Sequence, residues 1–207
     1  MHEIEILSEL RELAIPIYTS VHLGTFQKNN NEFHIVAGLD RELIRQLRER
    51  SLDESDLDIQ KNTSDKTRFG PEGAYEAWYG KGRTPFALVH KKSGALAALA
   101  WFGPKPLGRK SLRYLSDEEL REESSQKETE WHTIVYRSYA PYRGTGLMTP
   151  FMRFAIDEYL KFYPEAKLWA GLSTENPASI ALATKLGFKK SPEHYDEKEH
   201  WCALILE

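Results

Sequence analysis

The sequence predicts a mixed α+β or α/β fold in which helices flank a central mixed β-sheet, and three observations support it. Two apolar segments within residues 85–103 flank a glycine-containing turn and read as an antiparallel hairpin. From residue 130 onward, strand-like and helix-like segments alternate, which implies some parallel pairing. Hydrophobic residues make up 41% of the 207-residue chain, enough to form a buried core.

The first part of the chain predicts a helix, two strands and a second helix. Residues 3–14 carry apolar side chains at helical spacing, which is typical of a short amphipathic helix. Residues 15–26 and 33–38 read as extended segments, with an asparagine-rich turn between them. Asp40 is a suitable N-cap for a helix that begins at Arg41.

Shorter elements and a charged segment follow. Residues 72–79 predict a short helix, and residues 86–90 and 96–102 are the two strands of the hairpin. Residues 104–129 are charged and punctuated by proline and glycine. We interpret them as an insertion or flap with one candidate helix at 117–123.

The last third predicts strand, helix, strand, helix and strand. These segments are residues 130–138, 147–162, 167–173, 177–186 and 199–206. For the chain as a whole we expect an N-terminal extension at 1–32, helix plus strand, packed on a domain at 33–207 that contains the charged insertion.

Composition restricts the class of protein. The formal net charge is −3, from 28 basic and 31 acidic residues, which argues against a nucleic-acid partner bound by a broad basic surface. The single cysteine, Cys202, excludes an internal disulfide and a cysteine-built zinc site. No apolar run approaches the roughly 18 residues of a membrane span. We expect a cytoplasmic protein with no metal and no membrane partner.

The segment Tyr139–Leu147 is a candidate anion site. It joins a buried strand to an apolar helix, and Gly144 and Gly146 let the backbone turn tightly near a ligand. The first turn of a helix has unpaired N–H groups and a partial positive charge. Arg143 adds donors suited to phosphate. Close packing alone is the alternative reason for the glycines.

A second informative segment spans residues 173–188. Asn176 is suited to be an N-cap, Pro177 to the first helical position and Gly187 to the residue just past the helix. Taken alone, the pattern describes a well-capped helix.

Together the two segments resemble signatures of the GNAT superfamily, the Gcn5-related N-acetyltransferases. Arg143 and Gly146 match the pyrophosphate signature Arg/Gln-x-x-Gly-x-Gly/Ala, and Met148 replaces its last small residue. The second signature is matched by Asn176, Lys185, Gly187 and Phe188. The resemblance covers residues 130–207 and extends to the hairpin. It implies a mostly antiparallel, twisted sheet containing one splayed parallel pair, the strands at 130–138 and 167–173.

The resemblance also implies a co-substrate, acetyl-CoA, whose pantetheine arm would lie between the splayed strands. The residues that it assigns to coenzyme A binding are Tyr136, Arg137, Ser138, Arg143, Gly144, Thr145, Gly146, Leu147, Met148 and Asn176. Most of these contacts would be made by the main chain.

The implied reaction is direct transfer of an acetyl or other short acyl group to the primary amine of a small molecule or peptide. Glu130 and His132 are candidates for the general base, with a solvated carboxylate and a packed histidine as the alternative interpretations. Ala183 stands where many members carry a tyrosine that protonates the leaving thiol. Tyr136 and Tyr139 are candidates to replace that tyrosine.

The acceptor side of the site is less defined. The polar residues 63–69 and the aromatic side chains of Trp78, Tyr79, Trp101 and Trp131 are candidates for lining an acceptor pocket, with a capped turn and core packing as alternatives. Two other functions stay open: a CoA-binding sensor or regulatory protein with impaired catalysis, and an unrelated fold whose glycine turn binds a nucleotide. A homodimer paired through strand edges is a further option.

Overall fold

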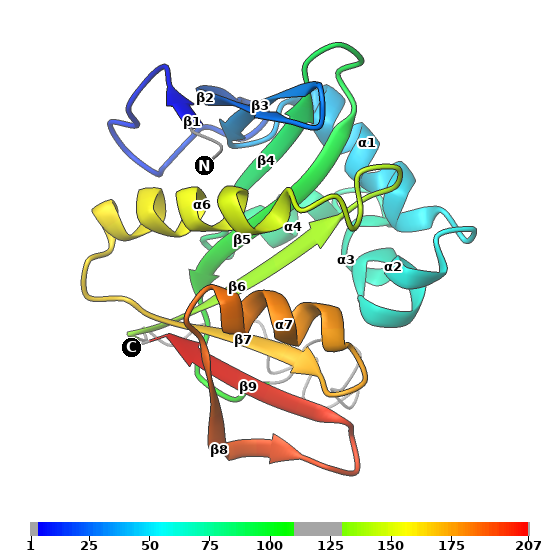
Figure 1. Ribbon diagram of the computed structural model, residues 1–207, viewed down its shortest axis with the longest axis vertical. Coiled ribbons are helices and arrows are strands. Elements are labelled where there is room, and N and C mark those ends of the chain that lie inside the picture. The colour runs from blue at the N-terminus through cyan, green and yellow to red at the C-terminus, as the bar shows by residue number, and fades with distance from the viewer. Residues whose placement is uncertain (1–3, 110–129, 207) are drawn as a thin grey trace.

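The computed structural model describes residues 4–109 and 130–206, and in these residues nine strands form one sheet (Figure 1). The strand order is β1-β2-β3-β4-β5-β6-β7-β9-β8. Neighbours pair antiparallel except β6 and β7, which are parallel. The mixed, mostly antiparallel sheet predicted from the sequence is therefore confirmed.

The bounds of the elements are as follows. The strands are β1 (Ile4–Ile6), β2 (Val21–Lys28), β3 (Asn31–Ala37), β4 (Thr84–His90), β5 (Leu96–Pro104), β6 (Trp131–Ser138), β7 (Lys167–Ser173), β8 (Lys189–Asp196) and β9 (Trp201–Leu206). The helices are α1 (Arg41–Leu52), α2 (Leu57–Asn62), α3 (Asp65–Phe69), α4 (Ala74–Tyr79), α6 (Met148–Phe162) and α7 (Pro177–Lys185). Within the described ranges, no helix is long and apolar enough to span a membrane.

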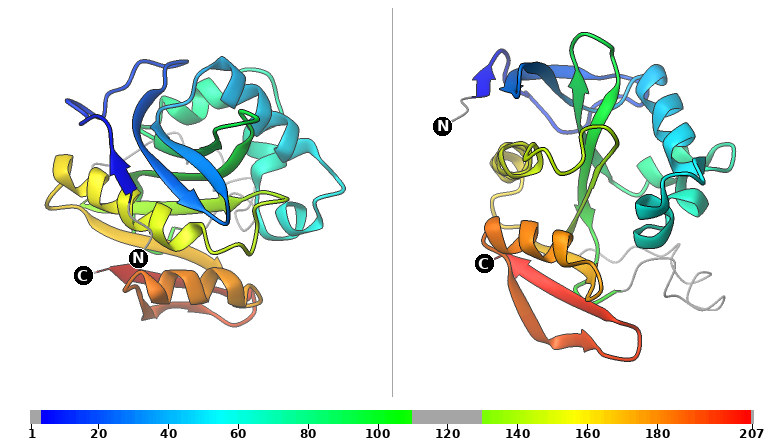
Figure 2. Two further views of the ribbon diagram at one scale, coloured as in Figure 1. Left: turned by 45° about the horizontal axis from the view of Figure 1, so that its top comes forward. Right: turned by 45° about the vertical axis from the view of Figure 1, so that its right-hand side comes forward.

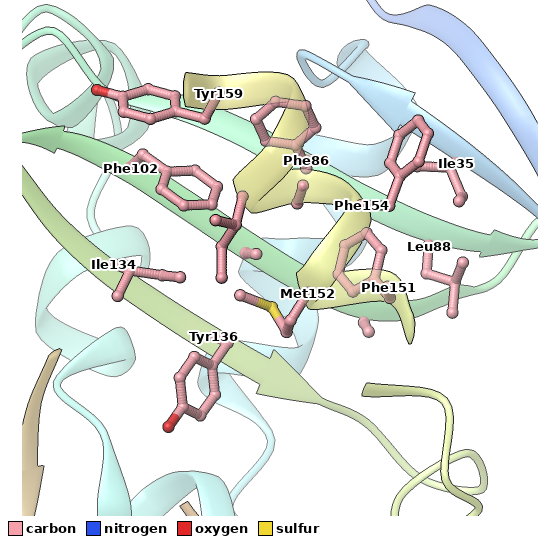
Figure 3. Packing of buried hydrophobic residues seen from close by; sticks show 14 of the residues in the cluster. Ile35, Phe86, Leu88, Phe102, Ile134, Tyr136, Phe151, Met152, Phe154 and Tyr159 are labelled. Atoms are coloured by element: carbon pink, nitrogen blue, oxygen red, sulfur yellow. The ribbon is translucent and has the colours of Figure 1, made fainter. Parts of the chain in front are cut away.

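The helices cover both faces of the sheet. Figure 2 shows α6 and α7 on one face and α1 to α4 on the other. The buried side chains of α6 pack onto those of β4, β5 and β6 (Figure 3). The residues in this contact include Phe86, Phe102, Ile134, Phe151 and Met152. A second cluster fills the space under α1, α3 and α4, and it includes Leu43, Leu47, Phe69, Trp78 and Trp101.

The elements with strong local signals occur where the sequence predicts them. Asp40 caps α1, because its Oδ1 atom accepts a hydrogen bond from the backbone N–H of Leu43 at 2.9 Å. Asn29 and Asn30 take positive φ angles in the turn between β2 and β3. The predicted helix at 72–79, the hairpin, α6 and α7 are all confirmed to within two residues.

The helix predicted over residues 3–14 is wrong, because Ile4–Ile6 form the edge strand β1. The β-branched residues Ile4 and Ile6 suit an extended strand. Gly24 permits the pairing with β2, since a Cβ atom there would lie 2.5 Å from the carbonyl oxygen of Glu5. Backbone pairing with β2 therefore determines the conformation of Ile4–Ile6, in spite of the helical spacing of the apolar residues at 3–14.

Besides β1, three elements were not predicted. Strand β8 has the sequence KKSPEHYD, which lacks an apolar alternation. It is an edge strand with a register shift between Lys190 and Tyr195, and an edge position tolerates its proline. Helices α2 and α3, within residues 57–69, are only six and five residues long. Most of the charged segment 104–129, including the candidate helix at 117–123, lies outside the described residues.

The parallel pair opens toward the C-terminal ends of its strands. Strand β6 pairs with β7 only from Trp131 to Thr133, opposite residues 167–169. Beyond Thr133 the two strands diverge (Figure 1), while β7 continues to pair with β9. The splayed pair implied by the resemblance is therefore present, and it leaves one edge of β6 without a neighbouring strand.

Candidate functional site

A cavity of about 710 Å³ occupies the opening between β6 and β7. Its lining comes from the glycine turn, β6, β7 and α7, and from α2, α3 and α4 on the opposite face of the sheet. The volume falls in the range usual for sites that bind a small molecule or cofactor. The splayed strands thus form a passage that reaches both faces of the sheet.

The free edge of β6 presents backbone groups to this cavity. The bonds from Tyr139 N to Ala97 O, at 3.0 Å, and from Lys105 N to Trp131 O, at 2.9 Å, show that odd-numbered residues of this strand pair with β5. Because antiparallel pairing alternates, the N–H groups of Ile134, Tyr136 and Ser138 face the opening. An extended ligand that carries amides can hydrogen-bond to such an edge as an added strand does.

The glycine turn ends in an uncapped helix. Gly144 and Gly146 have φ angles of +75° and +81°, a conformation that favours glycine. Leu147 precedes α6 and no described side chain caps the helix. The N–H groups of the first turn, from Met148 and Thr149, therefore lie at the lining of the cavity. This donor set fits an anion such as a pyrophosphate.

The guanidinium of Arg143 does not face the cavity as a free charge. Its Nη2 atom donates to Asp56 at 2.7 Å, and its Nε atom lies 3.3 Å from a carboxylate oxygen of Asp58. Asp56 also caps α2 through the N–H of Ile59. Burial raises the pKa of Asp56, but the bonds from Arg143 and the helix outweigh it and leave that pKa below its ordinary value. Arg143 thus fixes α2 beside the turn.

Arg137 faces α3 on the other side of the sheet. Its Nε and Nη2 atoms donate to both oxygens of Asp65 at 2.8 and 3.0 Å, and Arg68 donates to the same carboxylate at 2.8 Å. Asp65 is fully buried. Burial raises its pKa, yet the two guanidiniums hold that pKa below its ordinary value. Trp101 completes this wall, with the guanidinium carbons of Arg137 and Arg68 at 5.1 and 5.5 Å from its ring centre.

Helix α7 is fixed to β6 through Ser179. Asn176 caps the helix by accepting from Ser179 N at 3.0 Å, and the hydroxyl of Tyr136 donates to Ser179 O at 2.8 Å. Burial raises the pKa of Tyr136 above its ordinary value, which makes it a weak proton donor. Ala183 is fully buried and does not line the cavity. The hydroxyl of Tyr139 is buried without a partner among the described residues.

The two candidate bases lie outside the residues that line the cavity. The carboxylate of Glu130 forms an exposed ion pair with Lys167 at 2.9 Å. His132 is buried against α6, with its Nδ1 atom 2.7 Å from the hydroxyl of Tyr159. Of the ten residues assigned to coenzyme A, nine line the cavity and Thr145 does not, since its hydroxyl donates to the carbonyl of Tyr142 at 2.6 Å. Glu130 and His132 have other partners.

The residues predicted for an acceptor pocket are only partly found in the lining of the cavity. Trp78, Trp101 and four residues of the segment 63–69 line the cavity, whereas Tyr79 and Trp131 do not. Basic side chains from the α4–β4 connection and the end of β5 also line it, and they had no local signal in the sequence. Among the described residues, no cluster of histidine, cysteine, aspartate or glutamate could hold a metal ion.

Comparison with known proteins gives fold matches only. No protein-family model matches the chain, and no curated protein matches its sequence. An acetyltransferase from Agrobacterium tumefaciens has a similar structure, with a TM-score of 0.56, 12% identity, and coverage of 97% of this chain and 99% of that one.

Two further solved structures are similar. A GNAT-family acetyltransferase structure from Bordetella pertussis, described as putative, matches with a TM-score of 0.54 and 14% identity, over 87% of this chain and 98% of that one. Spermidine N-acetyltransferase from Vibrio cholerae, in complex with CoA and spermine, matches with a TM-score of 0.52 and 12% identity, over 84% and 92%. At these identities the likeness concerns the fold.

Proposed function

Because the chain has the GNAT acetyltransferase fold, we propose that it is an N-acyltransferase that moves an acetyl or other short acyl group from acyl-CoA to a primary amine. The observation that carries the proposal is the cavity in the opening of the parallel pair, which joins an uncapped helix N-terminus to a wall on the opposite face of the sheet. This arrangement suits two substrates that meet within the sheet.

The proposed roles follow from the geometry. The N–H groups of the glycine turn and of Met148 hold the pyrophosphate, and the free edge of β6 holds the amides of the pantetheine arm. The amine nitrogen attacks the thioester carbonyl, a C–N bond forms, the C–S bond breaks, and the thiolate leaves and takes up a proton to become the free thiol. The amine releases its proton to a base, for which Glu130 and His132 stay predictions.

Release of free thiol tests this proposal. The protein is incubated with acetyl-CoA and a panel of primary amines, and the thiol is followed with a chromogenic reagent while CoA binding is titrated separately. We expect CoA binding together with amine-dependent thiol release. Absence of CoA binding at millimolar concentration would exclude the proposal.

A second candidate function is a CoA-binding sensor or regulatory protein. Two observations favour it. The resemblance implies a proton-donating tyrosine at position 183, where this chain has a buried alanine. Asp58, the one carboxylate among the described lining residues, is paired with Arg143. Tight CoA binding without thiol release across the whole panel is the result that this candidate predicts.

A further inference from the structure

The β2–β3 hairpin lies against the glycine turn, although the two segments are distant in the sequence. The ring of Tyr142, in the turn, meets the ring of Phe33 edge to face at a centroid distance of 5.5 Å. It also lies 5.5 Å from the ring of His90. His90 in turn contacts Asn31 in the hairpin, with its Nε2 atom 3.1 Å from the side-chain oxygen of Asn31. These contacts hold the hairpin beside the candidate pyrophosphate site.

The hairpin contains a lysine whose side chain reaches the turn. Lys28 is the last residue of β2 and pairs with Asn31 across the hairpin. A Cβ atom at Gly146 would lie 3.7 Å from Cε of Lys28 and 3.9 Å from its Nζ. Gly146 itself lines the cavity. The ammonium of Lys28 is therefore next to the part of the turn that leads into α6.

Lys28 and Arg143 differ in whether their charge is already paired. Among residues 4–109 and 130–206, no group forms a side-chain hydrogen bond or an ion pair with the half-buried Lys28. Arg143, the residue that matches the pyrophosphate signature, donates to Asp56 and lies 3.3 Å from a carboxylate oxygen of Asp58. Of these two cations at the turn, Lys28 is therefore the one available to a phosphate.

We propose, on the basis of the function proposed above, that Lys28 binds the diphosphate of acyl-CoA and supplies the charge that the pyrophosphate signature assigns to Arg143. An ammonium acts on a phosphate oxygen as a compact point charge, and its flexible stem lets it follow the ligand. The N–H groups of the turn give the site its direction, and Lys28 gives it its net charge. The β2–β3 hairpin thus belongs to the co-substrate site.

Binding of coenzyme A and two of its fragments tests the proposal. Calorimetry measures the Kd of CoA, of dephospho-CoA, which keeps the diphosphate but lacks the 3′-phosphate, and of pantetheine, which has no phosphate. Lys28→Gln should raise the Kd for CoA and for dephospho-CoA about five- to twentyfold and leave that for pantetheine unchanged. Lys28→Arg should restore most of the affinity. The difference between the native protein and Lys28→Gln should shrink at high salt.

Lys198→Gln is the matched control. Lys198 is an exposed lysine in the connection between β8 and β9, which lie at the other end of the strand order from β2. The variant removes the same charge from the protein and should leave all three Kd values unchanged. Thermal unfolding without ligand should give the native Tm for both glutamine variants, so that a change in Kd does not reflect a defect in folding.

The outcomes separate this inference from the proposed function. An equal Kd for CoA in the native protein and Lys28→Gln overturns the inference, even if acetyl-CoA is turned over. Weaker binding of CoA but not of dephospho-CoA also overturns it, because Lys28 would then bind the 3′-phosphate. Weaker binding of both, without thiol release from the native protein, supports the inference and contradicts the acyltransferase.

Inorganic pyrophosphate is the probe if CoA does not bind, a result that excludes the proposed function. It is titrated onto the native protein and the same variants. A Kd for pyrophosphate that Lys28→Gln raises and Lys198→Gln does not supports the diphosphate site at Lys28. No binding to the native protein, or an equal Kd in Lys28→Gln, overturns it.

Discussion

At the scale of single residues, one carboxylate organises the wall of the cavity opposite the glycine turn. Asp65 is buried between Arg137 and Arg68, which come from a central strand and a short helix. Each guanidinium would be a costly buried charge without it. The contact joins residues 72 positions apart in the sequence, which is why no local pattern predicts it.

Replacing Asp65 should therefore destabilise the protein strongly. We expect Asp65→Asn to lower the free energy of unfolding by about 3–5 kcal/mol, because two buried guanidiniums lose their counter-ion. Urea denaturation measures this change. Glu54→Gln removes an exposed ion pair with Lys66 and is the control, expected to change stability far less than Asp65→Asn does. Similar effects of both variants would contradict the buried network.

The same carboxylate should make stability sensitive to acid. The pKa of Asp65 is lower in the folded state than in the unfolded chain, so its contribution is complete above the unfolded pKa and is lost as pH falls toward the folded value. The stability difference between the native protein and Asp65→Asn should be largest near neutral pH and should shrink below about pH 4. Denaturation series at several pH values test this. A difference that does not depend on pH would contradict the lowered pKa.

At the scale of elements, the turn into α6 and one face of α7 both line the cavity. The turn combines left-handed glycines with a helix start that no described side chain caps. Helix α7 presents Ala181, Leu182 and Lys185 to the cavity, while Ala183 faces the core. For each element, one substitution at the cavity or core can be compared with a matched control variant.

Gly146→Val should weaken CoA binding. Valine at a φ of +81° strains the turn and shifts the N–H groups, so we expect the Kd for CoA to rise about tenfold or more. Gly94→Val is the matched control, because Gly94 has a φ of +68° in a hairpin turn, where a Cβ atom would meet no other segment within 4 Å. It should cost similar stability and leave CoA binding unchanged. Fluorescence titration with CoA compares the two variants.

Restoring a tyrosine at position 183 should not restore a proton donor. Because Ala183 is fully buried, Ala183→Tyr is expected to overpack the core and to lower the free energy of unfolding by about 1–3 kcal/mol without a gain in kcat. Ala181→Tyr, on the exposed cavity face of the same helix, should be tolerated within about 0.5 kcal/mol. Thermal unfolding and thiol release test both variants. A faster Ala183→Tyr enzyme would contradict this placement of the helix.

The elements differ in how far local sequence predicts them. Caps, turn residues and apolar periodicity act within a few positions, so α1, α7, the hairpin and the glycine turn were all predictable. Strand β1 and strand β8 depend on a neighbour elsewhere in the chain, and they were not. The same holds for the site, since the Asp65 network joins distant segments, and local patterns carry no record of such contacts.

At the scale of the whole molecule, a cavity between two halves of the sheet couples ligand binding to stability. A ligand held only by the native state stabilises it by about 2.7 kcal/mol at a hundred times its Kd. For a domain of this size, that corresponds to a rise in Tm of roughly 5–10 °C. We expect CoA to produce such a shift and ATP to produce less.

Thermal scans with and without saturating CoA measure this. The Gly146→Val variant serves as the comparison, because its shift at the same CoA concentration should be smaller. An unchanged Tm of the native protein at millimolar CoA would show that the opening between β6 and β7 does not bind it.

The outermost strands bear on how the protein behaves when concentrated. A sheet of this width ends in two rows of backbone donors and acceptors that another molecule could extend. At one margin β1 is only three residues long, and at the other β8 carries two lysines, a proline and an irregular register. Short edge strands, charged side chains and proline are the means by which natural sheets resist edge-to-edge pairing with other molecules. The sheet margins therefore disfavour fibre-like association.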